Sequence, residues 1–148
     1  MKEKILNPIG MTESFYSQPP SQDLPLATAY WSEGTPLKTK YHVYPEMAAA
    51  GLWTTPTDLS KYIIEMQKSL KEESKKLLSK EMTQKMMTPH LKDGNTGLGV
   101  FISEILDKKY FQHGGSNEGF KCHYYGSLED GNGVVVMVNS ENYDIITE

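Results

Sequence analysis

Prolines gather near the start of this 148-residue chain and restrict its fold more than any other feature. Six of the eight prolines stand at positions 8, 19, 20, 25, 36 and 45. Proline lacks a backbone N–H, so it breaks helix interiors and central strands. We therefore expect residues 1–50 to form an irregular segment that packs over a surface. A chain of this length suits one domain, whose regular elements must come from the remaining residues.

Residues 51–90 carry the helical signals. Thr55 is a suitable cap residue and is followed by Pro56, which favours the first turn of a helix. Apolar residues then recur at helical spacing, at Leu59, Ile63, Met66 and Leu70. This pattern predicts a helix near residues 56–71. A second helix is predicted near residues 79–88, with an apolar face of core-filling methionines, Met82, Met86 and Met87.

Residues 91–148 carry strand patterns. Four strands are predicted, near residues 98–103, 109–113, 120–128 and 134–139. Residues 107–109 are interpreted as a turn, and the sequence EDGNG at 129–133 as a hairpin turn. The short connections predict an antiparallel meander, and the expected fold class is α+β.

The last predicted strand raises a question of coverage. Residues 134–138 read VVVMV, a continuous apolar run that is typical of a strand covered on both faces. Two helices are too few to provide that cover. We therefore expect residues 1–148 to be a single fragment of a larger domain. We also expect self-association through residues 134–138, because an uncovered apolar strand is a template for pairing.

Composition excludes several function classes. The net charge of −4 and pI near 5.6 argue against a nucleic-acid partner, which requires a basic face. No apolar run approaches the roughly 20 residues of a membrane-spanning helix. The four histidines and Cys122 show no metal-ligand spacing, and no Walker loop or dinucleotide fingerprint occurs, so neither a metal nor an organic cofactor is expected.

The sequence HGGS at residues 113–116 is the strongest candidate site. One interpretation is a strand that ends at a solvated histidine and turns at its glycines. In the other, the glycines let a substrate lie against the backbone, and the N–H groups stabilise an oxyanion. The His113 ring would then donate to a substrate carboxylate or take part in a proton relay.

Six short segments carry a family resemblance. They are residues 5–12 (ILNPIGMT), 26–30 (LATAY), 49–59 (AAGLWTTPTDL), 96–99 (TGLG), 113–120 (HGGSNEGF) and 133–140 (GVVVMVNS). In this order they resemble the C-terminal part of the serine β-lactamase and penicillin-binding family. The most similar branch contains class C β-lactamases, D-aminopeptidases, DD-carboxypeptidases and esterases.

The resemblance implies an incomplete β-lactamase/transpeptidase-like fold and a role for each residue of the H-x-G motif. His113 would face the catalytic centre, and Gly115 would leave room for substrate. The Ser116 backbone N–H would be one oxyanion donor, and Gly114 and Asn117 would contact substrate. A substrate amide or ester would lie antiparallel to this strand.

The resemblance also implies a serine hydrolase that acts through an acyl-enzyme on a β-lactam, a D-amino-acid peptide or an ester. Peptidoglycan-like substrates and an extracytoplasmic parent are expected. The family's S-x-x-K nucleophile motif and Y-x-N motif are absent from the 148 residues, so this chain alone is expected to be inactive. Two alternatives stay open: a non-catalytic binding module that keeps the fold, and a structural α+β domain in which His113 is incidental. The sequence does not separate lactamase, peptidase and esterase.

Overall fold

The computed structural model describes residues 1–92, 94–142 and 144. A helical turn, Lys2–Leu6, leads into a 3-10 turn, Asn7–Ile9. Three α-helices follow: α1 (Met47–Ala50), α2 (Pro56–Leu70) and α3 (Lys80–Met86). Four strands complete the order: β1 (Phe101–Ile105), β2 (Lys108–Asn117), β3 (Phe120–Ser127) and β4 (Gly133–Val138).

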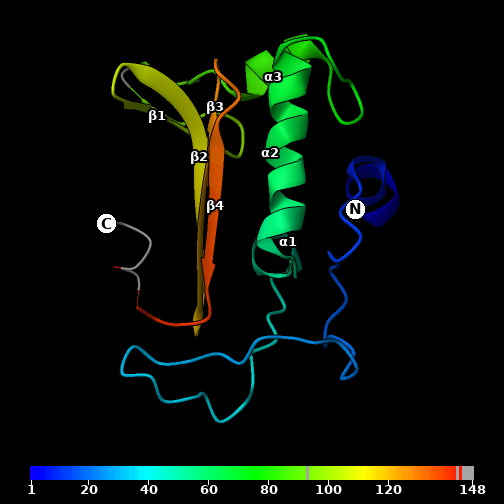
Figure 1. The fold of residues 1–148 in the computed structure, drawn as a ribbon, viewed down its shortest axis with the longest axis vertical. Coiled ribbons are helices and arrows are strands. Elements are labelled where there is room, and N and C mark those ends of the chain that lie inside the picture. The colour runs from blue at the N-terminus through cyan, green and yellow to red at the C-terminus, as the bar shows by residue number, and fades with distance from the viewer. Residues whose placement is uncertain (93, 143, 145–148) are drawn as a thin grey trace.

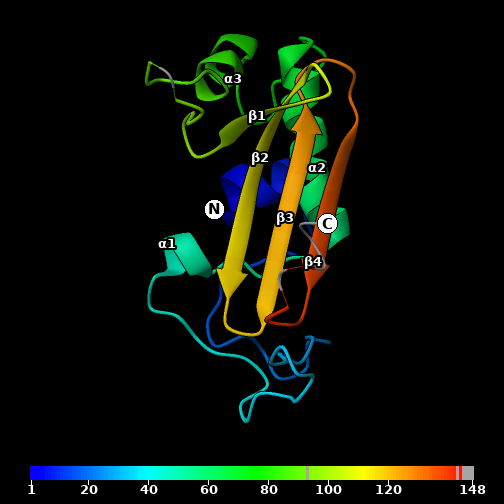
Figure 2. The same ribbon diagram turned by 90° about the vertical axis from the view of Figure 1, so that its left-hand side faces the viewer.

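The strands form one antiparallel sheet in the order β1-β2-β3-β4, which confirms the predicted α+β meander. Helix α2 lies against one face, over β3 and β4, and α3 packs beside α2. The N-terminal turns lie on the far side of α2 from the sheet (Figure 1). Residues 10–46, which contain no helix or strand of the sheet, loop past the end of the sheet where β2 and β3 are joined (Figure 2).

Local chemistry explains where α2 begins. The Thr55 hydroxyl accepts a hydrogen bond from the Asp58 N–H at 3.1 Å, and Pro56 occupies the first turn. The fully buried Asp58 carboxylate accepts from the Ser14 hydroxyl at 2.8 Å and from the Lys61 ammonium at 2.6 Å. These bonds satisfy a buried charge and attach the irregular segment to the helix. The predicted helix at residues 56–71 is thus confirmed.

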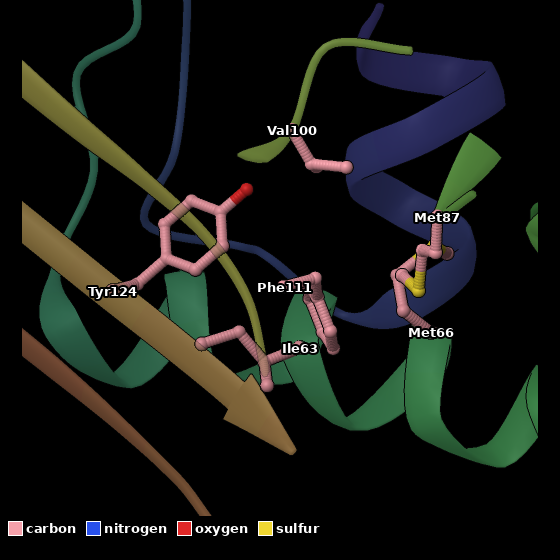
Figure 3. Packing of buried hydrophobic residues seen from close by; sticks show 6 residues of the cluster. All are labelled: Ile63, Met66, Met87, Val100, Phe111 and Tyr124. Carbon is pink, nitrogen blue, oxygen red and sulfur yellow. The ribbon is translucent and has the colours of Figure 1, made fainter. Parts of the chain in front are cut away.

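The main core lies between α2 and the sheet. Its six buried members come from both layers and from the segments beside α3 (Figure 3), namely Ile63, Met66, Met87, Val100, Phe111 and Tyr124. A smaller core is formed by Leu6, Ile9 and Met11 of the N-terminal segment. Tyr62 and Leu77 pack against both cores and join them.

The predicted methionine face of the second helix was wrong in one member. Met87 is buried, but Met82 points outward and is 51% exposed. Thr83 is fully buried in its place, where its hydroxyl lies 2.8 Å from the Ser69 hydroxyl of α2. A polar contact therefore fixes the rotation of α3 against α2, and the apolar spacing alone did not reveal it.

The first strand and the turn after it differ from their predicted bounds. Residues 98–100 form bends, where Gly99 has a φ of +72°, and β1 begins only at Phe101. The turn consists of Leu106 and Asp107, both with positive φ, so residue 108 already belongs to β2 and not to the predicted turn at 107–109. Leu106 is 92% exposed at this turn.

Strand β2 does not end at the histidine. It continues through both glycines to Asn117, because β3 pairs with it along its whole remaining length. The chain reverses at Glu118 and Gly119, where Gly119 has a φ of +74°. The expectation of a corner at residues 113–116 was therefore wrong, and His113 lies within an extended strand.

Strand β4 is an edge strand and not a strand covered on both faces. It pairs with β3 alone, and none of its residues is fully buried. Helix α2 covers one face of β4, while Val134 on the other face is 50% exposed.

Candidate active site along strand β2

One edge of β2 is only half occupied. Strand β1 pairs with β2 from Lys108 to Gln112, and the last pair is Phe101 with Gln112. Strand β2 runs five residues further, from His113 to Asn117, with β3 on its other side. These five residues therefore border open space on the side from which β1 has departed.

The alternation of an antiparallel ladder shows which backbone groups face this open edge. The Ile102 N–H donates to the Asn95 carbonyl and therefore points away from β2. Phe111, which lies opposite Ile102, must then direct its own backbone groups to β3. Alternate residues then point the other way, and the N–H and C=O groups of Gly114 and Ser116 face the open edge. Within the part of the chain that the structure describes, no backbone hydrogen bond engages either N–H.

The His113 side chain is exposed beside this edge. Its Nδ1–H donates to the carbonyl oxygen of Gly114, since a carbonyl can only accept. This bond directs Nε2 away from the strand backbone. The imidazole also packs on the ring of Phe101, with ring centroids 5.5 Å apart. The histidine is thus held by the strand that carries it and by the end of β1.

Gly115 lies directly opposite Cys122 of β3. A Cβ atom on Gly115 would stand 2.6 Å from the Cys122 sulfur, so the thiol occupies the space over the glycine. Burial raises the pKa of the Cys122 thiol, which disfavours the reactive thiolate. The absence of a side chain at residue 115 therefore has a packing reason in addition to any role in substrate access.

The Ser116 hydroxyl is exposed, and it accepts a hydrogen bond from the Lys121 ammonium at 2.7 Å. Lys121 is also paired with the Glu141 carboxylate, and its side chain is only 11% exposed. The Lys121 nitrogen is thus engaged by the Glu141 carboxylate and donates to the Ser116 hydroxyl, whereas the base of a serine nucleophile must accept from it. The Ser116 hydroxyl is therefore an acceptor in this arrangement, while its backbone N–H faces the open edge.

Contacts from the irregular segment fix the far end of the edge. The Asn117 amide donates to the Ala50 carbonyl of α1 at 3.1 Å, and the Tyr44 hydroxyl accepts from the Glu118 N–H at 2.9 Å. At Gly119 an added Cβ would lie 2.4 Å from the Cβ of Ala29. The proline-rich segment therefore braces the β2–β3 turn and places α1 beside the open edge.

The structure brings the predicted site residues together on one strand, and two further residues join them. Phe101 contacts His113, and Cys122 covers Gly115; sequence reasoning had assigned neither to the site. The register alone would have located Cys122, because a two-residue turn at 118–119 places residue 122 opposite residue 115. Finding Phe101 required knowledge of where β1 begins.

Two cavities lie elsewhere. One, of about 490 Å³, runs between α2 and the outer side of β4, and one of about 270 Å³ lies between α2 and residues 73–76. Among the described residues no group of three or more His, Cys, Asp or Glu side chains could hold a metal ion. No described helix is long and apolar enough to cross a membrane.

The sheet order, the α2 layer and the H-G-G edge define an α+β protein with the fold of the β-lactamases and penicillin-binding proteins. A family model described as Beta-lactamase matches residues 1–144, and the chain belongs to this family of serine hydrolases. A search of curated proteins found no match.

Solved structures agree with this assignment. The chain is similar to the octameric penicillin-binding protein homologue from Pyrococcus abyssi, with 29% identity and a TM-score of 0.76, covering 96% of this chain and 33% of that one. It is similar in fold to a penicillin-binding protein from Bacillus halodurans, with 22% identity and a TM-score of 0.76, covering 99% of this chain and 46% of that one. The D-amino acid amidase from Ochrobactrum anthropi SV3, complexed with L-phenylalanine amide, shows 16% identity and a TM-score of 0.68, covering 94% and 42%. The chain thus spans less than half the length of each.

Proposed function

We propose that residues 113–117 form one wall of an acyl-transfer site in a serine hydrolase that acts on D-amino-acid peptides, β-lactams or related esters. The observation that carries this proposal is the open edge of β2, where Gly114 and Ser116 present free N–H groups beside the ring of His113. Free N–H groups on a rigid strand are suitable donors to a carbonyl that develops negative charge. The D-amino acid amidase and penicillin-binding relatives support this substrate range.

Each residue has a role in this proposal. A substrate lies antiparallel along the open edge, and its acyl carbonyl accepts from the Ser116 N–H. Gly114 and Gly115 allow the substrate to approach the backbone, and the Nε2 of His113 meets its polar groups. Asn117 uses its amide nitrogen to hold α1, so its side-chain oxygen is the part available to a substrate.

The chemistry requires a nucleophile that these 148 residues do not contain, because no S-x-x-K motif is present. A serine oxygen would attack the acyl carbon, and its proton would pass to the neighbouring base and then to the leaving nitrogen or oxygen. Water would cleave the acyl-enzyme, releasing the acid and restoring the serine. The chain would contribute oxyanion stabilisation and substrate alignment to both steps.

A second candidate is a binding module that uses the same edge without chemistry. It is favoured by the ion-paired state of Lys121, which leaves Ser116 without a base. Extended peptides add to open sheet edges through main-chain hydrogen bonds. Finding S-x-x-K and Y-x-N motifs in the same protein would favour the hydrolase, and their absence would favour the module.

The edge can be tested in the 148-residue chain by amide NMR with N-acetyl-D-alanyl-D-alanine. Shifts should be largest at Gly114 and Ser116 and absent at Val135 and Met137, which lie on the opposite, equally open sheet edge. The variant His113→Ala should keep the melting temperature, because this side chain is exposed, yet weaken binding. Equal shifts at both edges, or none at Gly114 and Ser116, would contradict the proposed site.

We also propose that the chain self-associates through β4, as an uncovered apolar strand predicts. The Asn132 carbonyl accepts from the Ser127 N–H of β3, so alternation directs the backbone groups of Gly133, Val135 and Met137 outward. The strand contains no charge and no proline to discourage pairing. A second copy of β4 could pair antiparallel across a two-fold axis and extend the sheet.

A further inference from the structure

We infer that Phe101 is a specificity-determining residue for the leaving group of the substrate, on which it selects a short group of at most three residues with an aromatic or large apolar side chain. This inference rests on the proposed function and deepens it. It starts from the position of the first residue of β1, because that residue limits the open edge.

The direction of the substrate determines which of its parts meets Phe101. A substrate antiparallel to β2 runs from the Asn117 end toward the Gln112 end. If its acyl carbonyl accepts from the Ser116 N–H, the next residue along the substrate lies opposite Gly115 and Gly114. That residue is on the leaving side of the bond to be cleaved, so the leaving group points at the end of β1.

The space for the leaving group is short. Phe101 pairs with Gln112, so only residues 113, 114 and 115 lie between Ser116 and the part of the β2 edge that β1 occupies. Before Phe101 the chain turns inward, because Val100 is 1% exposed in the core and its carbonyl accepts from the Gly97 N–H. A leaving group of at most three residues fits along this stretch, and a longer peptide would collide with β1.

The free backbone group on this stretch is a donor. The His113 Nδ1–H already occupies the carbonyl of Gly114, while the Gly114 N–H remains free on the edge. Residues 113 and 115 direct their backbone groups to β3. Along this stretch the leaving residue therefore meets the free Gly114 N–H, which suits a carboxylate, and no free backbone carbonyl.

The apolar surface at the end of this stretch is the Phe101 ring. It is 36% exposed and packs at 5.5 Å on the His113 ring in a tilted arrangement. An aromatic side chain on the leaving residue can pack against this pair in the same way, and a methyl group cannot. Such contacts are worth about three- to tenfold in affinity.

The test compares N-acetyl-D-alanyl-D-phenylalanine with N-acetyl-D-alanyl-D-alanine by amide NMR titration of the full 148-residue chain. The first compound should bind the parent chain about three- to tenfold more tightly. This preference should vanish in Phe101→Ala and in Phe101→Leu. The leucine variant keeps the apolar bulk of residue 101, so it serves as the test if the alanine variant unfolds. It should persist in Ile105→Ala, a matched change at the exposed far end of β1 (44% exposed).

The outcomes separate this inference from the function on which it rests. Shifts at Gly114 and Ser116 with an unchanged preference in both Phe101 variants would overturn the role of Phe101 and leave the proposed function standing. No shift at these two amides with either compound would overturn both. Tight binding of a longer peptide, such as the same compound extended by three residues at its carboxyl end, would also overturn the short leaving-side site.

Discussion

The sulfur atom of Cys122 lies over Gly115, only 2.6 Å from the position that a Cβ on residue 115 would take. The two residues are partners across the β2–β3 ladder. This contact gives the second glycine of the H-G-G sequence a structural reason that is separate from substrate binding. It can therefore be tested without any substrate.

Gly115→Ala should destabilise the chain by about 1–3 kcal/mol, because the added methyl group overpacks against the thiol. The double variant Gly115→Ala with Cys122→Ala should recover most of this loss, since the smaller side chain vacates the space. Urea unfolding of the four chains of the double-mutant cycle measures the coupling. Additive effects would show that the thiol does not restrict residue 115.

The isolated chain should neither hydrolyse a chromogenic cephalosporin nor become acylated by a labelled penicillin. Losing a catalytic serine costs on the order of a million-fold in turnover in a serine protease, and no S-x-x-K motif occurs here. Intact-mass spectrometry after incubation with penicillin measures the adduct. A stoichiometric adduct, above all one mapped to Ser116, would contradict the assignment of that residue's role to its backbone N–H.

Stability should fall as the pH drops below about 6.5, partly because of His123. Burial, and then the nearby charge of His113, lowers the pKa of His123 below its ordinary value of 6.5. The unfolded chain therefore binds a proton at a higher pH than the folded chain does. This shift favours the unfolded state as the pH falls from 6.5 toward the folded pKa.

His123→Gln should flatten this part of the pH profile, measured as the urea midpoint between pH 7 and 5. Glutamine keeps a polar group near Gln112, whose side-chain oxygen lies 2.8 Å from the His123 Nε2. His90→Gln is the matched control, because that ring is exposed on the surface. Identical profiles for the parent chain and His123→Gln would refute the role of His123.

Self-association should depend on the outward backbone groups of β4. Met137→Pro removes an N–H that faces solvent, so it should abolish association while keeping the β3–β4 ladder. Val136→Pro removes an N–H that faces β3, and it should instead unfold the sheet. Sedimentation velocity over a dilution series, with a thermal melt of each variant, distinguishes the two effects. A compact monomer at every concentration of the parent chain would end this proposal.

Much of the secondary structure could be predicted from the sequence because its causes are local. The predicted bounds of α2 lie within one residue of the observed bounds, 56–70. They were predicted from Thr55, Pro56 and the apolar spacing that follows. The hairpin residues 129–133 placed the last turn in the same way. Caps, turns and periodicity act through neighbouring residues, so they can be read without the tertiary structure.

The candidate site depended on contacts between distant segments. The H-G-G sequence indicated a site, but as a corner, because glycines in isolation favour turns; the pairing of β3 kept residues 114 and 115 extended. Similarly, helical spacing showed which residues of α3 share a face, while the Ser69–Thr83 contact decided which face is buried.

The sequence by itself determined the meander, the principal helix and the family to which the segments point. The tertiary structure alone decided that β1 begins at Phe101, opposite Gln112, while β2 continues beyond that pair, and this difference opens the edge at Gly114 and Ser116. The physical reason is that a backbone donor is free only where no other segment reaches it. Whether a segment reaches that donor depends on the register and the bends of segments that are far apart in the sequence, and no local pattern encodes these.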